Sequence, residues 1–312
     1  MQLIIAREHH GQTVLSYIRQ QLHVSSKMLK YLKYRPDGIC VNGKHCTVRY
    51  LLQEGDVLTL ATEDTEANEH LAPVDLPLDI LYEDADVVVP SKPADMPTHP
   101  SRYHYGDTVA NALAFRYAAA GGSFVFRPIN RLDRNTSGLL LVARNKLSAG
   151  RLAIAMQAGQ IQKSYLAVLD GEMPLGKGKI DACLHRTEKS IILREVCSPD
   201  APDADTALTE YRVLASQNGH TLVQASPITG RTHQLRVHFA SLGHPITGDD
   251  LYGTPSPHIS RHALHARTLT FPHPTTGERM TFTAPLPADL LRLTELYFPK
   301  IPLPDTDRKE QA

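Results

Sequence analysis

The sequence predicts an α+β fold in which a small N-terminal domain precedes a much larger one. Beyond its start, the 312-residue chain has many short apolar runs separated by glycine- and proline-containing turns, a pattern typical of antiparallel sheets. The start of the chain instead predicts two short helices and a hairpin. An acidic, proline-bearing segment between these regions is typical of a linker. We therefore expect domains over residues 1–62 and 79–300, a linker over 63–78 and a flexible tail over 301–312.

The composition is that of an ordinary soluble globular protein, with 42% hydrophobic and 21% charged residues. No stretch approaches the ~18 apolar residues that a membrane span requires. The N-terminus lacks the basic flank and apolar core of a secretory signal. The four cysteines are scattered without a Cys-x-x-Cys pair, which indicates reduced thiols rather than disulfides or zinc ligands. We therefore expect a cytoplasmic protein.

Two amphipathic helices are predicted in the first 35 residues. Thr13 is a candidate cap for the first helix, and Ser25 or Ser26 for the second. Apolar residues at helical spacing should face inward, namely Leu15, Ile18, Leu22, Met28, Leu29 and Leu32. Lysines should face outward from the second helix, namely Lys27, Lys30 and Lys33.

A hairpin follows, because Asn42-Gly43 between short apolar runs favours a type I′ turn. Gly55-Asp56 then precedes a last strand. Two helices packed on such a hairpin resemble the αL RNA-binding motif, the type found in ribosomal protein S-four. That resemblance implies that Lys27 and Lys30 bind RNA phosphates. The alternative is a small α/β domain whose lysines only solvate one face.

The net charge of zero hides blocks of opposite sign. Residues 1–60 carry eight basic against four acidic residues, and residues 101–170 carry nine against three. Residues 61–100 carry one basic against ten acidic residues. Local basic faces are therefore available for nucleic acid, although the overall charge predicts weak non-specific binding.

The segment RLDRNTSGLLL, residues 131–141, places Asp133 between Arg131 and Arg134, ahead of a turn and an apolar strand. Neighbouring cations favour the charged form of a carboxylate. A turn at the mouth of a buried strand is also a rigid mount for a reactive group. Taken alone, such a segment is more often a surface salt-bridge cluster at the start of a strand.

Five ordered blocks resemble the RluA-type RNA pseudouridine synthases. They are Ile80–Ser101, Arg131–Asn145, Lys163–Met173, Thr229–Gly253 and Ala263–Glu278. They occur in the family's order and spacing, and the resemblance extends over about residues 80–286.

Two positions depart from the family pattern. Many relatives have His where this chain has Asn130, and Gly where it has Asp95. Neither position belongs to the residues that the resemblance assigns to the chemistry.

The resemblance implies a large, mixed but mostly antiparallel curved sheet with a central RNA cleft. It also implies isomerisation of uridine to pseudouridine, in which the glycosidic bond is broken and the uracil is rotated and rejoined through carbon five. This reaction uses no cofactor. We also expect no metal, because the sixteen histidines show no metal-ligand spacing with a suitable acid.

By the same resemblance, Asp133 is the catalytic carboxylate, acting as a nucleophile or as a general base. Tyr165 would stack on the uracil; taken alone, it could be a core tyrosine. Arg231 would pair with Asp133. It lies just before a helix that we expect to be capped by Thr232 and ended by Gly243, which agrees with this role. Taken alone, Arg231 could be an arginine bound only to solvent.

The remaining implied contacts are with RNA. Arg131 would enter the stack as the target base flips out. Other residues would line the RNA channel, namely Lys92, His99, Arg134, His233 and Arg236. We expect a monomer that acts on large-subunit ribosomal RNA rather than transfer RNA.

Two alternatives remain open. A non-catalytic RNA-binding protein could keep the same fold. A glycoside hydrolase would need a second acid near Asp133, and none occurs between Thr108 and Lys163.

Overall fold

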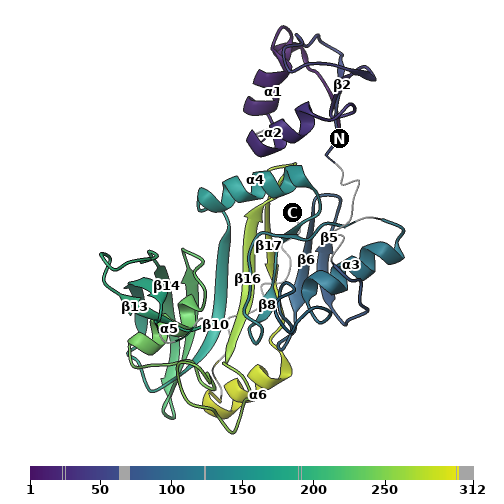
Figure 1. Cartoon of the computed structure of the whole chain (residues 1–312). Helices are drawn as coiled ribbons and strands as arrows, with labels where there is room; N and C mark the ends of the chain where they lie inside the picture. Colours follow the sequence, from purple (N-terminus) through teal and green to yellow (C-terminus); the bar gives the residue numbers. More distant parts are fainter. Residues whose placement is uncertain are drawn as a thin grey trace.

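The computed structural model describes residues 1–22, 24, 26–62, 71–122, 124–188, 190, 192–299 and 301. Outside this description lie the side chain of Lys27, the candidate cap Ser25, the first half of the expected linker and nearly all of the expected tail. Figure 1 shows the N-terminal domain at one end of a larger sheet. Among the described residues, no helix combines the length and the apolar character needed to cross a bilayer.

The N-terminal domain packs two helices on a four-stranded antiparallel sheet of order β1-β4-β2-β3. Its elements are β1 (Gln2–Ile4), the 3-10 helix η1 (Arg7–His9), α1 (Val14–Gln20), α2 (Ser26–Lys33), β2 (Ile39–Val41), β3 (Lys44–His45) and β4 (Val57–Leu60). The helix–helix–hairpin order predicted from the sequence is therefore confirmed.

Local signals in this domain act largely as predicted. The Thr13 side chain accepts a hydrogen bond from the Ser16 amide at 3.2 Å and caps α1. Asn42 and Gly43 both have positive φ, at 51° and 76°, as a type I′ turn requires. One position differs, because Leu15 is exposed and Val14 is buried in its place.

The large domain is built on an eleven-stranded sheet in which β16 and β8 form the parallel pair. The main path is β11-β14-β15-β10-β16-β8-β6-β9-β7, with β17 on β16 and β5 on β6. The strands are β5 (Asp79–Glu83), β6 (Val87–Lys92), β7 (Arg127–Pro128), β8 (Ser137–Leu139), β9 (Val142–Ala143), β10 (Gln162–Asp170), β11 (Gly176–Asp181), β14 (Leu208–Gln217), β15 (His220–Pro227), β16 (Leu264–Pro272) and β17 (Arg279–Thr283). The mostly antiparallel sheet is confirmed.

In the part of the large domain that the structure describes, four helices and a separate hairpin accompany this sheet. They are α3 (Val109–Ala119), α4 (Lys146–Gln157), α5 (Gln234–Ser241), α6 (Ala288–Tyr297) and the hairpin β12 (Cys183–Arg186) with β13 (Arg194–Cys197). In Figure 1, α3 lies beside β5 and β6, whereas α5 lies beside β13 and β14. Helices therefore lie on the side of the sheet that contains β5 and β6 and on the side that contains β14.

The second half of the expected linker belongs to the large domain. The Asn111 side chain in α3 donates to the Ala72 carbonyl at 2.7 Å, and the Val74 amide donates to the Asn111 carbonyl at 3.2 Å. Leucines at 71, 76 and 78 pack on the main core. Apolar side chains interleaved with the prolines thus bind residues 71–78 to the domain that they precede.

Helix α4 connects the two domains. Leu147 is buried in the hydrophobic cluster of the N-terminal domain, and the Arg151 guanidinium donates to the Leu22 carbonyl at 3.0 Å. The Lys146 ammonium lies 3.7 Å from the centre of the Tyr31 ring. The N-terminal domain is therefore docked on the large domain through this helix (Figure 1).

Candidate active site

A cavity of about 1090 Å³ lies between the two halves of the large sheet, and most of the predicted site residues line it. Those on its wall are His99, Arg131, Asp133, Arg134, Tyr165, Arg231, His233 and Arg236. The remaining three predicted residues are Lys92, which is buried elsewhere, and Lys27 and Lys30, which lie on α2.

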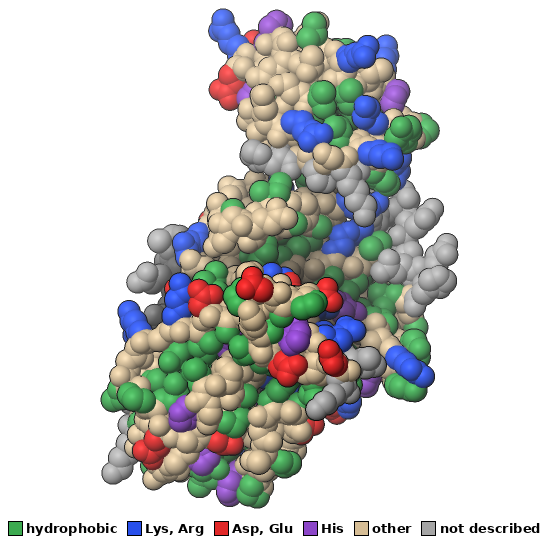
Figure 2. Space-filling view, turned by 60° about the vertical axis from the view of Figure 1, so that its left-hand side comes forward, with side chains coloured by type: hydrophobic (Ala, Val, Ile, Leu, Met, Phe, Trp, Pro, Cys, Tyr) green, Lys and Arg blue, Asp and Glu red, His purple; other side chains and the backbone are tan. Residues whose placement is uncertain are grey.

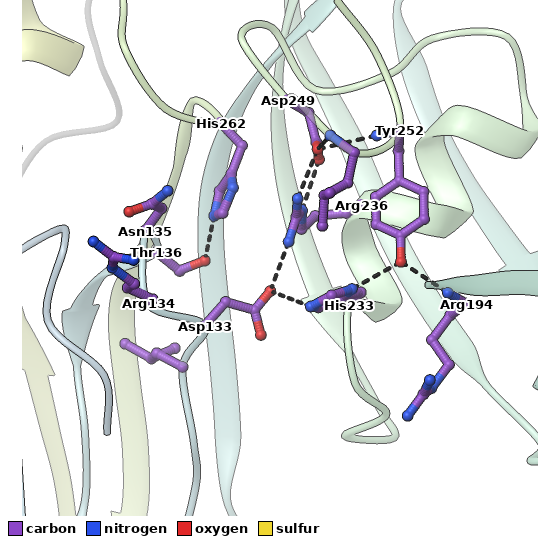
Figure 3. A network of polar contacts seen from close by, with 12 residues as sticks. Asp133, Arg134, Asn135, Thr136, Arg194, His233, Arg236, Asp249, Tyr252 and His262 are labelled. Carbon is purple, nitrogen blue, oxygen red and sulfur yellow. Dashed lines mark hydrogen bonds and ion pairs between the residues drawn. The ribbon is translucent and has the colours of Figure 1, made fainter. Parts of the chain in front are cut away.

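The turn that carries Asp133 is held by its neighbours on both sides. The Thr98 hydroxyl donates to the Leu132 carbonyl at 2.9 Å, and the Thr136 amide donates to the Asp133 carbonyl at 3.0 Å. The Thr136 hydroxyl in turn bonds to His262 Nε2 at 2.7 Å. The backbone at Asp133 is thus fixed while its side chain projects into the cavity (Figure 3).

The residue after this turn, Gly138, has to be glycine for two structural reasons. Its φ of 114° favours glycine, and a Cβ added there would lie 2.2 Å from the Ala266 carbonyl oxygen. Gly138 pairs with Ala266 where β8 meets β16. Any larger residue would separate these strands and displace the turn before them.

Arg236, rather than Arg231, faces the Asp133 carboxylate. Its guanidinium lies 3.5 Å from Asp133 Oδ2 and forms a bidentate pair with Asp249, both hydrogen bonds being 2.7 Å (Figure 3). Burial opposes the charge of Arg236, but its hydrogen bonds to Asp249 and the charges of Asp249 and Asp133 together outweigh burial and raise its pKa. Burial likewise opposes the charge of Asp249, and Arg236 outweighs it to lower the pKa of Asp249.

The predicted pairing of Arg231 with Asp133 is therefore wrong. Arg231 lies 3.1 Å from the Asp205 carboxylate and donates to the Thr206 carbonyl at 3.0 Å. The reason is local, because α5 begins after His233, whose φ of 57° is left-handed, and Thr232 is not the cap. This turn directs Arg231 away, whereas Arg236 on the first turn of the helix faces Asp133. Gly243, with φ of 78°, follows the helix as predicted.

His233 is the second group that faces Asp133. Its Nε2 lies 3.9 Å from Asp133 Oδ2, and its Nδ1 lies 2.7 Å from the Tyr252 hydroxyl. That hydroxyl accepts a hydrogen bond from the Arg194 amide at 2.9 Å (Figure 3). Burial lowers the pKa of His233, although the charge of Asp133 opposes this effect.

These contacts favour one tautomer of neutral His233. The Tyr252 hydroxyl already accepts from Arg194, so its own proton is available to His233 Nδ1. The proton on His233 then belongs on Nε2, where it faces the Asp133 carboxylate. Two independent neighbours thus favour the same tautomer.

Tyr165 lies beside Asp133 with little solvent exposure. It is on β10, at a bulge between Ser164 and Tyr165 in the pairing with β16. Burial and then the charge of Asp133 raise the pKa of its phenol. A phenol that resists ionisation suits stacking better than proton abstraction.

Lys92 does not line the cavity, contrary to the prediction. Its side chain is only 1% exposed, and its ammonium donates to the carbonyls of Pro93, Met96 and Arg134 at 2.8 Å each. Burial lowers its pKa to about 7, with the charge of Asp133 opposing. Nothing in the local sequence distinguishes a lysine at the end of a buried strand from one that faces a channel.

The other predicted RNA contacts differ in whether their side chains are already paired within the protein. Arg131 is exposed at the cavity, whereas the Arg134 guanidinium donates to Asp95 at 2.7 Å. Asp95 has a φ of 61°, which accounts for the glycine that relatives have at this position. His99 is half-buried, and burial followed by the charge of Arg131 lowers its pKa. The other departure, Asn130, bonds the backbone of Leu139 and Leu141.

Several residues of the site were not predicted. Asp249 and Tyr252 lie in the Gly-Asp-Asp-Leu-Tyr-Gly stretch that ends the block Thr229–Gly253, and His262 directly precedes the next block. Their signal in the sequence was limited to polar side chains within the fourth block, for Asp249 and Tyr252, and next to the fifth block, for His262. Only the fold brings these three together around Arg236 and Thr136.

Comparison with known proteins identifies the class of this site. The family model described as RNA pseudouridylate synthase matches residues 86–241. The chain belongs to the RluA-type RNA pseudouridine synthases. It is therefore an isomerase that acts on uridine in RNA.

Individual relatives cover most of the chain. Uncharacterized RNA pseudouridine synthase YjbO of Bacillus subtilis (strain 168) is 39% identical over 273 residues, or 88% of this chain and 95% of the relative. Ribosomal large subunit pseudouridine synthase D of Vibrio cholerae is 36% identical over 271 residues, or 82% of each chain. The solved structure of Human RNA Pseudouridylate Synthase Domain Containing 1 has a TM-score of 0.59 at 30% identity, covering 74% of this chain and 92% of the human one.

Proposed function

We propose that this enzyme modifies uridines of large-subunit ribosomal RNA and that Asp133 is its catalytic carboxylate. The observation that carries the assignment of Asp133 is its place in the cavity, where Arg236 and His233 face its side chain. The choice of RNA follows relatives whose names specify the ribosomal large subunit, at 36% and 37% identity.

Asp133 has the geometry required of a group that reacts with the ribose. Its carboxylate has contacts of 3.5 and 3.9 Å to its cationic and histidine neighbours, which leave its oxygens accessible from the cavity. Attack on the sugar and removal of the sugar's second proton both need such a carboxylate. Tyr165 provides a buried aromatic surface beside it, suited to stacking on the uracil.

Arg131 is the residue best suited to stabilise the RNA after the uridine flips. It is exposed at the cavity and lies two residues from Asp133, whereas Arg134 is engaged by Asp95. A planar guanidinium can stack in the space that the uridine vacates and offset part of the cost of flipping. His99 lies beside Arg131 on the same wall.

The N-terminal domain would extend the RNA surface. Its fold has the order of the αL motif, and Lys and Arg side chains gather on one face of it in Figure 2. Lys30 and Lys33 are exposed on α2. Such cations hold phosphates without reading sequence. We propose that the enzyme acts as a monomer.

A glycoside hydrolase is disfavoured by the cavity. Retaining and inverting enzymes use two carboxyl groups flanking the bond. Among the described residues that line this cavity, Asp133 is the only acid. Asp249, the buried acid that pairs with Arg236, is held in a bidentate pair and is not among the residues that line the cavity.

The proposal is tested with RNA carrying tritium at carbon five of uridine. Wild type, Asp133→Asn and Asp205→Asn are incubated with ribosomal and with transfer RNA, each transcribed without modification. We expect tritium release by wild type and Asp205→Asn, none by Asp133→Asn, and faster release from large-subunit ribosomal RNA.

Three results would count against the proposal. Release by Asp133→Asn at the wild-type rate would remove Asp133 from the chemistry. A preference for transfer RNA would overturn the assignment of the substrate. Free uracil in place of pseudouridine would indicate a hydrolase.

A further inference from the structure

A tight turn at the rim of the cavity carries Arg102 and Tyr103 at its tip. Ser101 and His104 flank this pair and exchange both backbone hydrogen bonds, at 3.0 and 2.9 Å. The same two flanking residues line the cavity that contains Asp133. The side chains at the tip therefore lie where an RNA strand would enter or leave.

Tyr103 occupies a backbone position that favours glycine. Its φ is 72°, in the left-handed region, which a bulky side chain adopts only at a conformational cost. The cost is not recovered by packing, because the ring is 77% exposed. The recorded contact of the ring is with the guanidinium of its neighbour Arg102, 5.1 Å from the ring centre. A strained, exposed tyrosine indicates a function other than folding.

The rest of the loop is anchored to the protein, and a second aromatic ring, that of Tyr105, is exposed. The His104 ring lies 2.6 Å from the Asp107 carboxylate, and the Asn111 side chain donates to the Tyr105 carbonyl at 3.0 Å. The Tyr105 side chain is nevertheless 71% exposed. Two aromatic rings and one guanidinium thus project from a loop whose base is fixed.

We propose that Arg102, Tyr103 and Tyr105 form a stacking platform for unpaired RNA bases next to the target uridine. Aromatic rings and guanidinium planes are the side chains on which splayed single-stranded bases stack. A base pair within a duplex offers its faces to its neighbours and has none free for such rings. The occupant is therefore a single-stranded segment flanking the uridine. This inference rests on the proposed function, since it assumes that RNA occupies the cavity.

Tyr103→Gly separates this proposal from a structural role. Glycine relieves the left-handed backbone, so the melting temperature should stay equal or rise, while the stacking ring is lost. Tyr103→Phe keeps the ring and serves as the matched variant. Leu175→Ala, at an exposed position outside the cavity wall, serves as the surface control.

Binding is measured by fluorescence anisotropy with a labelled single-stranded oligouridine and a blunt RNA duplex. We expect Tyr103→Gly to weaken binding of the single strand about tenfold, the size of one lost stack, and to leave duplex binding within twofold. Tyr103→Phe and Leu175→Ala should bind as wild type does.

Unchanged single-strand affinity in a folded Tyr103→Gly variant would overturn the platform. Equal losses on single strand and duplex would also overturn it, because they indicate a general electrostatic contact. Should Tyr103→Gly fail to fold, Tyr103→Asn tests the same loss, since asparagine tolerates a positive φ. A wild type that turns over no uridine would instead contradict the proposed function, whatever the binding of these variants.

Discussion

Replacement of Arg236 by glutamine should remove both activity and stability. The side chains of Arg236 and Asp249 are 4% and 0% exposed, and their bidentate pair is buried. Loss of one member leaves the other charge uncompensated, at a cost of ~3–5 kcal/mol in the free energy of unfolding. Asp133 loses its cationic neighbour at the same time, and misplacement of a reacting group costs about 10²-fold in rate.

Arg231→Gln is the matched control. Its ion pair with Asp205 lies at the surface, with Arg231 39% exposed, so its loss should cost ~0–1 kcal/mol. We expect kcat within about threefold of wild type. Urea denaturation and tritium release under saturating RNA measure the two effects on the same preparations.

The double variant Arg236→Gln with Asp249→Asn separates folding from catalysis. It removes both buried charges, so stability should recover relative to either single variant. Activity should not recover, because Asp133 still lacks a cation. The reasoning is refuted if Arg231→Gln loses more activity than Arg236→Gln, or if the double variant regains the wild-type rate.

Three further predictions follow from the site and the domain contact. Tyr252→Phe should lower kcat about tenfold with KM unchanged, because His233 loses the hydroxyl that fixes its tautomer, and nitrogen-15 shifts of the ring should report the change. Lys92→Met should be destabilised by three unpaired carbonyls. Burial lowers the pKa of Lys92 to about 7, below the ~10.4 of an unfolded lysine, so the unfolded chain binds more protons between these values. Wild-type stability relative to Lys92→Met should therefore rise from pH 7.5 to 9.5. Deletion of residues 1–62 should weaken RNA binding and flatten its salt dependence.

Each of these predictions has a contradicting result. An unchanged His233 spectrum in Tyr252→Phe would show that the hydroxyl does not set the tautomer. A stability difference independent of pH would show that the Lys92 amine keeps its proton in the folded state. Equal salt slopes for the full and shortened chains would leave the N-terminal lysines as a solvated face.

The elements that sequence predicted well are those determined by local backbone chemistry. Asn42-Gly43 specifies its turn through positive φ at both residues, and Thr13 specifies a helix start through one side-chain bond. The resemblance also identified Asp133 and Tyr165 correctly as residues that line the cavity. Each could be assigned because it is the chemically distinctive residue of its motif. Such signals do not depend on how distant parts of the chain meet.

The errors arise where two similar residues compete for one place. Arg231 and Arg236 lie five positions apart, and only the left-handed turn at His233 decides which one faces Asp133. Lys92 has the sequence context of a channel residue, yet its strand ends inside the core, where its ammonium meets two nearby carbonyls and the Arg134 carbonyl of a distant turn. Tertiary packing decides both cases.

The relative lengths of the contacts around Arg236 indicate how the site keeps Asp133 reactive. Arg236 bonds Asp249 at 2.7 Å but lies 3.5 Å from Asp133. Asp249 also accepts the Leu251 and Tyr252 amides, so it is the fully satisfied member of the trio. A carboxylate bound as tightly as Asp249 would have few free lone pairs for the ribose. By holding Arg236 from behind, Asp249 lets the guanidinium supply positive charge to Asp133 without occupying its oxygens, which is the condition for a nucleophile or base to act.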